Sequence, residues 1–277
     1  MNEVTTFLDL PARSPKPRAA GLTHVLDKGV PVAEVAGRLA ASGRWIDVWK
    51  FGWGTAYLDP DVEQKLRLLA EHQVRACVGG TLLEVAWSQD KVAEFLGWAT
   101  AMGFPCIEVS RGAVDMPLDE KWNLIRQVVA ARSFAVVSEV GAKDPSAPAT
   151  PEAWIAEAAG DLEAGARWVL TEGRESGTVG MFREDGSLRS DLLEALVSAL
   201  GLGHLVFEAP RKDQQAWFIN RFGPDVNLAN IALDDTIGLE ALRLGLRADT
   251  LGPVARLRTL ERLPVEPVEP VVERHRS

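Results

Sequence analysis

The sequence predicts an α/β protein, a single-domain (β/α)8 barrel of the TIM type, and three observations support this fold class. Short apolar runs alternate along the chain with amphipathic segments, eight of each. The pairs recur about every thirty residues and total about 250 residues, which is typical of this barrel. Many amphipathic segments begin at Pro, Asp, Ser or Thr and end at Gly, as helix caps prefer. An open Rossmann-like sheet is the alternative, but no GxGxxG follows the first apolar run.

The apolar runs are expected to be strands because they are short and rich in Val, Ile, Leu and aromatic residues. In order, the strands are expected within residues 22–27, 45–51, 74–80, 105–110, 134–141, 167–173, 204–210 and 226–232. The segments between them place apolar residues at helical spacing. In order, the helices are expected within residues 31–43, 59–73, 90–103, 117–132, 150–165, 187–201, 211–223 and 234–247.

The two ends of the chain differ from this alternating body. Residues 1–20 contain Pro and Arg and are expected to be an N-terminal extension. Residues 253–277 lose helical periodicity to prolines and charges and are expected to form a tail outside the fold. The catalytic domain is therefore expected over residues 21–252.

Composition excludes several classes of protein. The net charge of −9 argues against a nucleic-acid partner, since a phosphate backbone needs a basic face. No apolar run reaches the roughly eighteen residues that a membrane span requires, and no signal peptide is recognised, so we expect a cytoplasmic protein. The two cysteines, Cys77 and Cys106, and four scattered histidines indicate neither a disulfide framework nor a zinc site. A metal, if used, is expected to have oxygen ligands.

Polar residues mark the ends of most of the predicted strands. Such residues close seven of the eight strands: Asp27 and Lys28, Lys50, Glu108 and Ser110, Glu139, Glu172, Glu208, and Asn230. In this fold the active site lies at the carboxyl ends of the strands. Alternation along a strand places Lys50 on the side of Val48, and Glu139 on the side of Val137, and such small side chains suit a barrel interior. A single polar strand end is also explained by contact with solvent, whereas seven together favour a functional mouth.

Glycine-rich loops follow several of these strand ends. "GWGT" follows Lys50, "GGT" begins at Gly79, and "VGAK" and "GRESGTVG" begin at Val140 and Gly173. Glycine lets backbone N–H groups approach an anion, although it is also the commonest turn residue. The last loop adds Arg174 and Ser176 to its glycines, and arginine binds phosphate or carboxylate with two hydrogen bonds. Small anionic substrates are therefore favoured.

The motifs at the strand ends resemble, in order, those of the phosphosulfolactate synthase family. They are "GLTHVLDKG", "IDVWKFGWGT", "GGTLLE", "IEVS", "SEVGAK", "EGRESG", "VFEAP" and "VNLANIA", and the resemblance covers about residues 18 to 252. It implies a (β/α)8 barrel that assembles as a homo-oligomer, trimer-based. It also implies magnesium-dependent addition of sulfite to phosphoenolpyruvate, giving (2R)-phosphosulfolactate in sulfolactate biosynthesis.

The resemblance also implies roles for particular residues. Lys143, after the "EVG" of the fifth strand, is the proton donor that the resemblance implies, and we place Lys50, Glu139 and Arg174 beside it as catalytic groups. The expected magnesium ligands are Asp27, Glu108 and Glu139. The expected substrate-binding residues are Lys28, Glu172, Ser176, Glu208 and Asn230.

One residue departs from the family pattern. Ser110-Arg111-Gly112 stands where many members read "SDG", so a base replaces an acid beside the predicted mouth. Either Arg111 points outward, or it alters the metal site or the nucleophile that the enzyme accepts. The alternatives to sulfite addition are therefore a different nucleophile in the same site and a non-catalytic relative with a role in stress tolerance.

Overall fold

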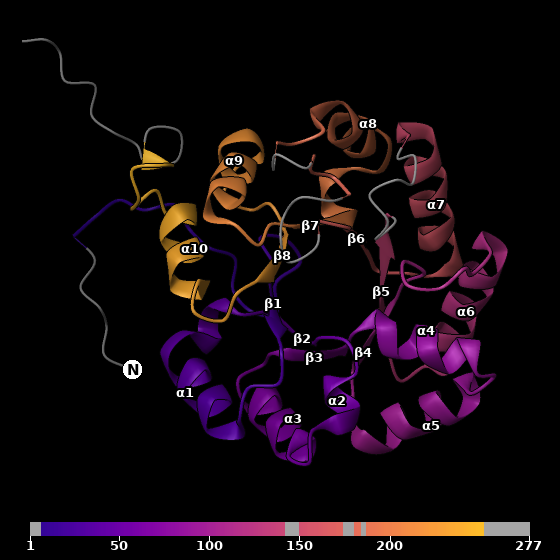
Figure 1. Ribbon diagram of the computed structural model, residues 1–277. Coiled ribbons are helices and arrows are strands. Elements are labelled where there is room, and N and C mark those ends of the chain that lie inside the picture. Colours follow the sequence, from indigo (N-terminus) through magenta and orange to yellow (C-terminus); the bar gives the residue numbers. More distant parts are fainter. Residues whose placement is uncertain (1–6, 142–149, 174–179, 184–186, 252–277) are drawn as a thin grey trace, which may run out of the picture.

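The computed structural model describes residues 7–141, 150–173, 180–183 and 187–251. Its centre is a closed barrel of parallel strands in sequence order, which confirms the predicted fold class (Figure 1). The strands are β1 (Thr23–Asp27), β2 (Val48–Phe51), β3 (Arg75–Val78), β4 (Cys106–Val109), β5 (Ala135–Val140), β6 (Trp168–Thr171), β7 (Leu205–Glu208) and β8 (Leu228–Ile231). Each expected strand segment contains one of these strands.

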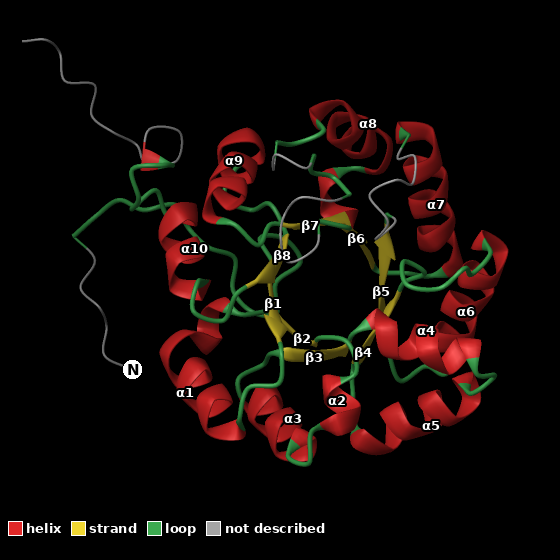
Figure 2. Ribbon diagram, viewed as in Figure 1, coloured by secondary structure: helices red, strands yellow, loops and turns green. Residues whose placement is uncertain are grey.

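Helices surround the barrel on its outer side (Figure 2). They are α1 (Val32–Ser42), α2 (Thr55–Leu58), α3 (Val62–Glu71), α4 (Gly80–Ser88), α5 (Val92–Met102), α6 (Leu118–Ala130), α7 (Pro151–Ala164), α8 (Ser190–Leu200), α9 (Lys212–Phe222) and α10 (Thr236–Arg243). The sequence pattern missed α2 and α4, because their short segments follow glycines that are typical of loops. No helix in the described part of the chain is long and apolar enough to cross a bilayer.

Two apolar layers hold the barrel together. The larger layer lies between the strands and the helices and contains Trp49, Phe51 and Phe207. The smaller layer fills the barrel interior with Leu22, Val48, Cys77, Cys106, Val137, Trp168, Leu170, Val206 and Ala229. Val48 and Val137 lie in the interior layer while Trp49 lies outside, as the alternation along the strands predicts.

Charged side chains close the amino-terminal end of the barrel. Arg167 and Arg75 lie 4.4 and 5.3 Å from the ring centroid of Trp168. The described part of the N-terminal extension packs here, because Arg18 donates to the buried carboxylate of Asp47 at 2.9 Å. Asp47 in turn accepts from the backbone N–H of Thr23 at 2.9 Å. The carboxyl end of the barrel is therefore the end where an active site is expected.

Candidate active site

Four side chains from the predicted strand ends meet inside the carboxyl end of the barrel. Lys50 of β2, Glu108 of β4, Glu139 of β5 and Glu208 of β7 are all buried, and we call them the lysine–glutamate cluster. Each follows an interior apolar residue two positions earlier, since Val48, Cys106, Val137 and Val206 belong to the interior layer. Residues far apart in the sequence thus reach one place because strand alternation directs them to the same side.

Lys50 is the centre of this cluster. Its Nζ lies 2.7 Å from Glu108 Oε2 and 3.7 Å from Glu139 Oε2. Burial disfavours its charge, but the carboxylates of Glu108, Glu139 and Glu208 outweigh burial and raise the pKa of Lys50. The ammonium group therefore stays charged across the physiological pH range.

The carboxylate of Glu108 is held by the amino-terminal end of α4. The backbone N–H of Gly80 donates to Glu108 Oε1 at 2.9 Å, where the helix dipole favours negative charge. A Cβ on Gly80 would lie 2.1 Å from Ser110 Oγ, and one on Gly79 would lie 2.7 Å from the carbonyl oxygen of Phe51. The "GGT" segment does let a backbone N–H approach an anion, but the anion in this structure is the protein's own glutamate.

Glu208 is held in a similar way on the other side of the mouth. The backbone N–H of Gly173 donates to Glu208 Oε2 at 2.8 Å. Burial, with repulsion from Glu139 as the next cause, raises the pKa of Glu208 to about 7. This carboxyl group is therefore partly protonated at neutral pH, unlike a carboxylate in water.

Glu172 and Asn230 are buried near the carboxyl ends of β6 and β8. Glu172 directly follows β6, two residues after the interior residue Leu170. Asn230 lies in β8, where the pairing with β1 shifts by one residue, and its φ of 54° falls in the left-handed region. Gly141 and Gly180 approach Glu172 so closely that a Cβ would lie 2.8 Å from its Cβ and 2.0 Å from its carbonyl oxygen, respectively.

Asp27 is not part of the cluster, and its expected role as a magnesium ligand stays a prediction. It follows Val25 of the outer layer, so it faces the helices instead of the interior. Its Oδ1 accepts from the backbone N–H groups of Gly29 and Val30 at 2.7 and 2.9 Å. Its Oδ2 accepts from the Trp49 indole at 3.0 Å. Asp27 therefore shapes the β1–α1 turn, and the next residue, Lys28, is exposed.

Arg111 is not a member of the cluster, and its side chain lies against α7. Its Nε and one terminal nitrogen donate to the two carboxylate oxygens of Glu157 on α7, at 3.1 and 3.0 Å. The neighbouring Ser110 instead hydrogen-bonds Glu84 of α4. The base at position 111 thus pairs with an acid of α7, outside the barrel interior.

The remaining predicted site residues lie outside the described residues. They are Lys143, Arg174 and Ser176. Gly141, two residues before Lys143, and Gly173, directly before Arg174, are both described and both lie against the glutamates at the mouth. The described residues that precede Lys143 and Arg174 therefore lie beside Glu172 and Glu208 at the carboxyl end of the barrel.

The sequence reasoning missed His24, Glu84 and Glu157. His24 is buried in β1, and burial, with Lys50 as the next cause, lowers its pKa to about 3. Both of its ring nitrogens lack a hydrogen-bond partner among the described residues.

Glu157 and Asp161 are acids one helical turn apart on the buried face of α7. Their spacing within an apolar stripe is the sequence signal that could have found them.

The residues of the cluster can be tested for a divalent cation. No group of three acidic, histidine or cysteine side chains in the described part of the chain is arranged to hold a metal. Magnesium commonly uses one or two carboxylates, and waters and substrate oxygens complete its shell. Glu108 and Glu139 are buried carboxylates beside a single ammonium group, so the donor set fits magnesium in ligand type and charge.

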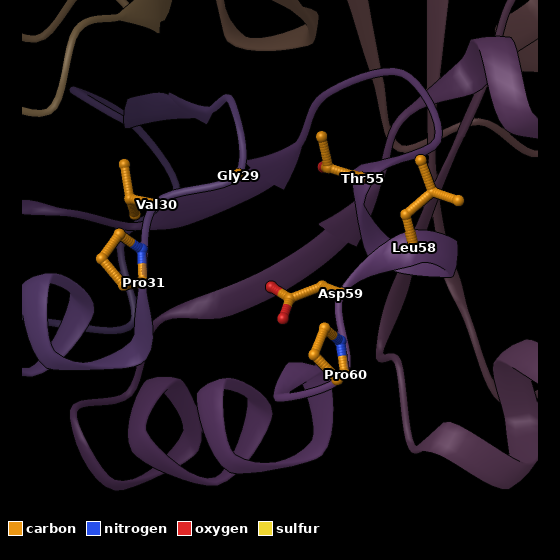
Figure 3. Close-up of a pocket in the computed structure, with 7 residues that line it drawn as sticks. All are labelled: Gly29, Val30, Pro31, Thr55, Leu58, Asp59 and Pro60. Atoms are coloured by element: carbon orange, nitrogen blue, oxygen red, sulfur yellow. The ribbon is translucent and has the colours of Figure 1, made fainter.

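A separate pocket opens between the loops that follow β1 and β2 (Figure 3). It has a cavity volume of about 330 Å³ and is lined by Gly29, Val30, Pro31, Thr55, Leu58, Asp59 and Pro60. Asp59 pairs with the buried ammonium group of Lys65. The pocket contains none of the predicted site residues and is mostly apolar, so it is separate from the lysine–glutamate cluster.

The fold and this cluster define a (β/α)8-barrel enzyme whose acids and base meet at the carboxyl ends of the strands. Residues 11–249 match the family model described as (2R)-phospho-3-sulfolactate synthase (ComA). The chain belongs to this family, whose members are lyase-type enzymes.

Individual relatives agree with this assignment. The phosphosulfolactate synthase of Bacillus subtilis is 42% identical over 246 residues, which cover 88% of this chain and 97% of the relative. That of Methanocaldococcus jannaschii is 43% identical over 239 residues, covering 84% and 95%. Protein HEAT-STRESS-ASSOCIATED 32 of Arabidopsis thaliana is 24% identical over 260 residues, covering 83% and 88%.

Solved structures show the same fold at low identity. The 3-keto-L-gulonate-6-phosphate decarboxylase of Vibrio cholerae superposes with a TM-score of 0.54 at 11% identity, covering 81% of this chain and 97% of that one. The 3-hexulose-6-phosphate synthase of Salmonella typhimurium has a TM-score of 0.52 at 14% identity, covering 83% and 93%. These likenesses concern the barrel alone.

Proposed function

We propose that this protein catalyses the magnesium-dependent addition of sulfite to phosphoenolpyruvate and forms (2R)-phosphosulfolactate. The names of the relatives and the family match support the product class. The observation that carries the proposal is the buried excess of acid, in which three glutamates face one lysine. Anionic substrates reach such a site only with additional positive charge, because like charges about 4 Å apart repel by about 4 kcal/mol at an effective dielectric constant of 20.

Magnesium would be held by Glu108 and Glu139, with substrate oxygens and waters completing its shell. When bound, this ion supplies Lewis-acid stabilisation of the negative charge that develops on the substrate carboxylate. Lys50 keeps both glutamates in place and adds its own positive charge to the mouth. Lys28, Glu172, Ser176, Glu208 and Asn230 are proposed to bind and orient the substrates.

The reaction forms one bond and moves one proton. The sulfur lone pair of sulfite attacks the methylene carbon of phosphoenolpyruvate, and the carbon–carbon π electrons move toward the carboxylate. Lys143 then donates its proton to the adjacent carbon and sets its configuration. Arg174 is proposed to bind the phosphate through two hydrogen bonds.

The role of Lys143 gives a direct prediction. Lys143→Ala should lose turnover by a factor of about 100 or more, while phosphoenolpyruvate binding changes little, because the lysine acts on the new carbon centre. Steady-state kinetics and titration calorimetry with phosphoenolpyruvate measure the two quantities. Near-normal turnover in this variant would reject the assignment.

The product identifies the nucleophile. Purified protein is incubated with phosphoenolpyruvate, sulfite and MgCl2, with an equimolar thiol as competing nucleophile, and the products are read by mass spectrometry. We expect phosphosulfolactate only, and no product when EDTA replaces MgCl2. A thioether product would instead show a different nucleophile, and no product under any condition would favour a non-catalytic role.

The two alternative functions have less support from the structure. Arg111 was the reason to consider another nucleophile, and its guanidinium binds Glu157 outside the cluster. A non-catalytic protein gains no stability from burying several glutamates around one lysine, because desolvation of such groups costs several kcal/mol each.

The location and assembly of the protein are also proposals. We propose a cytoplasmic homo-oligomer, trimer-based, as the resemblance implies. Both cysteines are free in the structure, which is the state that a reducing compartment maintains.

A further inference from the structure

A network of charged side chains lies outside the barrel, between β5 and the helices α6 and α7. Lys121 of α6 is fully buried, and its Nζ donates to Glu157 Oε1 and Asp161 Oδ2, both at 2.7 Å. The same Nζ donates to the backbone carbonyl oxygen of Glu139 at 2.8 Å. Arg111 completes the network through its two hydrogen bonds to Glu157. We call Arg111, Lys121, Glu157 and Asp161 the outer network.

The outer network is balanced in charge, with two cations facing two carboxylates. Glu157 is nine-tenths buried at its side chain, yet Lys121 and Arg111 outweigh burial and lower its pKa. The carboxylate of Asp161 already pairs with Lys121 at 2.7 Å. Glu157 is therefore the counter-charge of Arg111 and a second acceptor for Lys121, so that one carboxylate serves both cations.

Glu157 is connected to both glutamates that flank Lys50. On one side it binds Arg111, which lies three residues after Glu108 in the loop that follows β4. On the other side it binds Lys121, whose Nζ also binds the carbonyl oxygen of Glu139 near the end of β5. The two strand ends that carry Glu108 and Glu139 are thus joined through one carboxylate on α7.

We propose that Glu157 is a positioning residue that, with Arg111, fixes the spacing of Glu108 and Glu139 around Lys50. The proposal rests on the proposed function for its kinetic consequences, but its geometric content is independent of the substrate. Lys50 Nζ lies 2.7 Å from Glu108 and 3.7 Å from Glu139, and the strands that carry these glutamates pair directly, with Glu108 opposite Val137. A carboxylate that acts on substrate or ion loses efficiency when its support is removed, typically by 10- to 100-fold for supporting hydrogen bonds.

The test uses two variants and two controls. Glu157→Gln keeps an oxygen acceptor but removes the charge, and Arg111→Met removes the guanidinium while keeping the side chain's bulk. Arg111→Lys is the conservative control because it keeps the positive charge. Arg38→Met is the matched surface control, because Arg38 pairs with Glu34 at 3.1 Å on the partly exposed side of α1 and belongs to neither the cluster nor the outer network.

The expected result is a split between kinetic constants. Glu157→Gln and Arg111→Met should lower kcat for phosphosulfolactate formation by about tenfold or more, with the KM for phosphoenolpyruvate changed less than about threefold. Arg111→Lys should recover most of the lost kcat, and Arg38→Met should match the original protein. Unchanged kcat in both test variants, or a fall in Tm with unchanged kcat, would show a merely structural role and overturn the proposal.

Crystal structures of the two variants separate this proposal from the proposed function. We expect the distance from Lys50 Nζ to Glu139 to change relative to the original protein, with the barrel otherwise unaltered. If the original protein makes no phosphosulfolactate, the proposed function fails and this distance alone decides the positioning role. An unchanged lysine–glutamate cluster in both variant structures would refute it.

Discussion

At the residue scale, the stability of the fold depends on whether each buried charged group has a partner of opposite charge. Lys50 faces three glutamates, and its ammonium group is what makes their burial tolerable. Removing one partner of a buried ion pair usually costs about 3–5 kcal/mol, because the other charge is left uncompensated. The cluster is therefore a point of low tolerance to substitution.

Lys50→Met should lower the free energy of unfolding at pH 8 by about 3 kcal/mol and abolish turnover. The loss should be smaller at pH 5.5, because the unpaired glutamates can then bind protons and become neutral. Urea unfolding at the two pH values measures both numbers. A loss of stability that is the same at both pH values would contradict the electrostatic explanation.

His24 provides a second prediction about charge. Its pKa is lowered from the ordinary histidine value of 6.5 to about 3 in the folded protein, so the folded form binds fewer protons than the unfolded chain between these values. Stability from the neutral ring is present above pH 6.5 and is lost as the pH falls toward 3, by at most about 1.4 kcal/mol per pH unit.

His24→Leu should therefore become more stable relative to the original protein as the pH falls from 7 to 5. Glu208 and Asp161, whose pKa values are raised to about 7 and about 6, oppose this trend but are present in both proteins. Unfolding free energies at pH 7, 6 and 5 give the difference, with the exposed His72→Leu as control. A difference that does not vary with pH would contradict the buried neutral histidine.

At the element scale, the short helix α4 matters because its first turn supports Glu108. Gly80 donates its N–H to that carboxylate, and its α-carbon lies against Ser110. The sequence pattern predicted a loop here because the helix begins with two successive glycines, Gly79 at its cap and Gly80 in its first turn. Glycine is required at position 80 because the start of α4 approaches Ser110, thirty residues further along the chain. Nothing in the local sequence around Gly80 indicates this contact.

Gly80→Ala should destabilise the protein by about 2 kcal/mol or more, because the new Cβ would lie 2.1 Å from Ser110 Oγ and displace the helix end from Glu108. Gly97→Ala in α5 is the matched control. A Cβ there meets nothing within 4 Å, so it should stabilise the helix by about 0.5–1 kcal/mol. Equal effects of the two substitutions on Tm would contradict this view of α4.

At the scale of the whole molecule, the barrel separates stability from chemistry. The amino-terminal end is closed by Trp168, its two arginines and the pair of Arg18 with Asp47, whereas the cluster occupies the carboxyl end. This division is typical of the fold, in which catalytic residues lie at the carboxyl ends of strands. Substitutions at the two ends should therefore change different quantities.

Arg18→Met tests this separation. It leaves the buried carboxylate of Asp47 without its guanidinium partner and should cost about 3 kcal/mol of unfolding free energy. The kcat of the folded variant should stay within about twofold of the original at a temperature well below its Tm. A large fall in kcat with unchanged stability would show that the two ends are coupled.

The sequence predicts the barrel and the cluster well for a physical reason. The period of two along a strand and the place of active sites in this fold together direct Lys50, Glu108, Glu139 and Glu208 to one place. The same reasoning does not bring Asp27 into the cluster, because alternation along β1 places Asp27 on the side of Val25, in the outer layer. Arg111 was ambiguous because its partner, Glu157, is on a different helix and only the folded chain brings them together.

The central claim is that the lysine–glutamate cluster binds an anionic substrate only together with a divalent cation. Titration calorimetry of phosphoenolpyruvate into the protein, with magnesium and then with EDTA, tests this most directly. The account predicts that removing magnesium weakens binding at least tenfold, and that Glu139→Gln weakens the magnesium-dependent binding. Equal affinity with and without magnesium, or binding unaffected by Glu139→Gln, would contradict it.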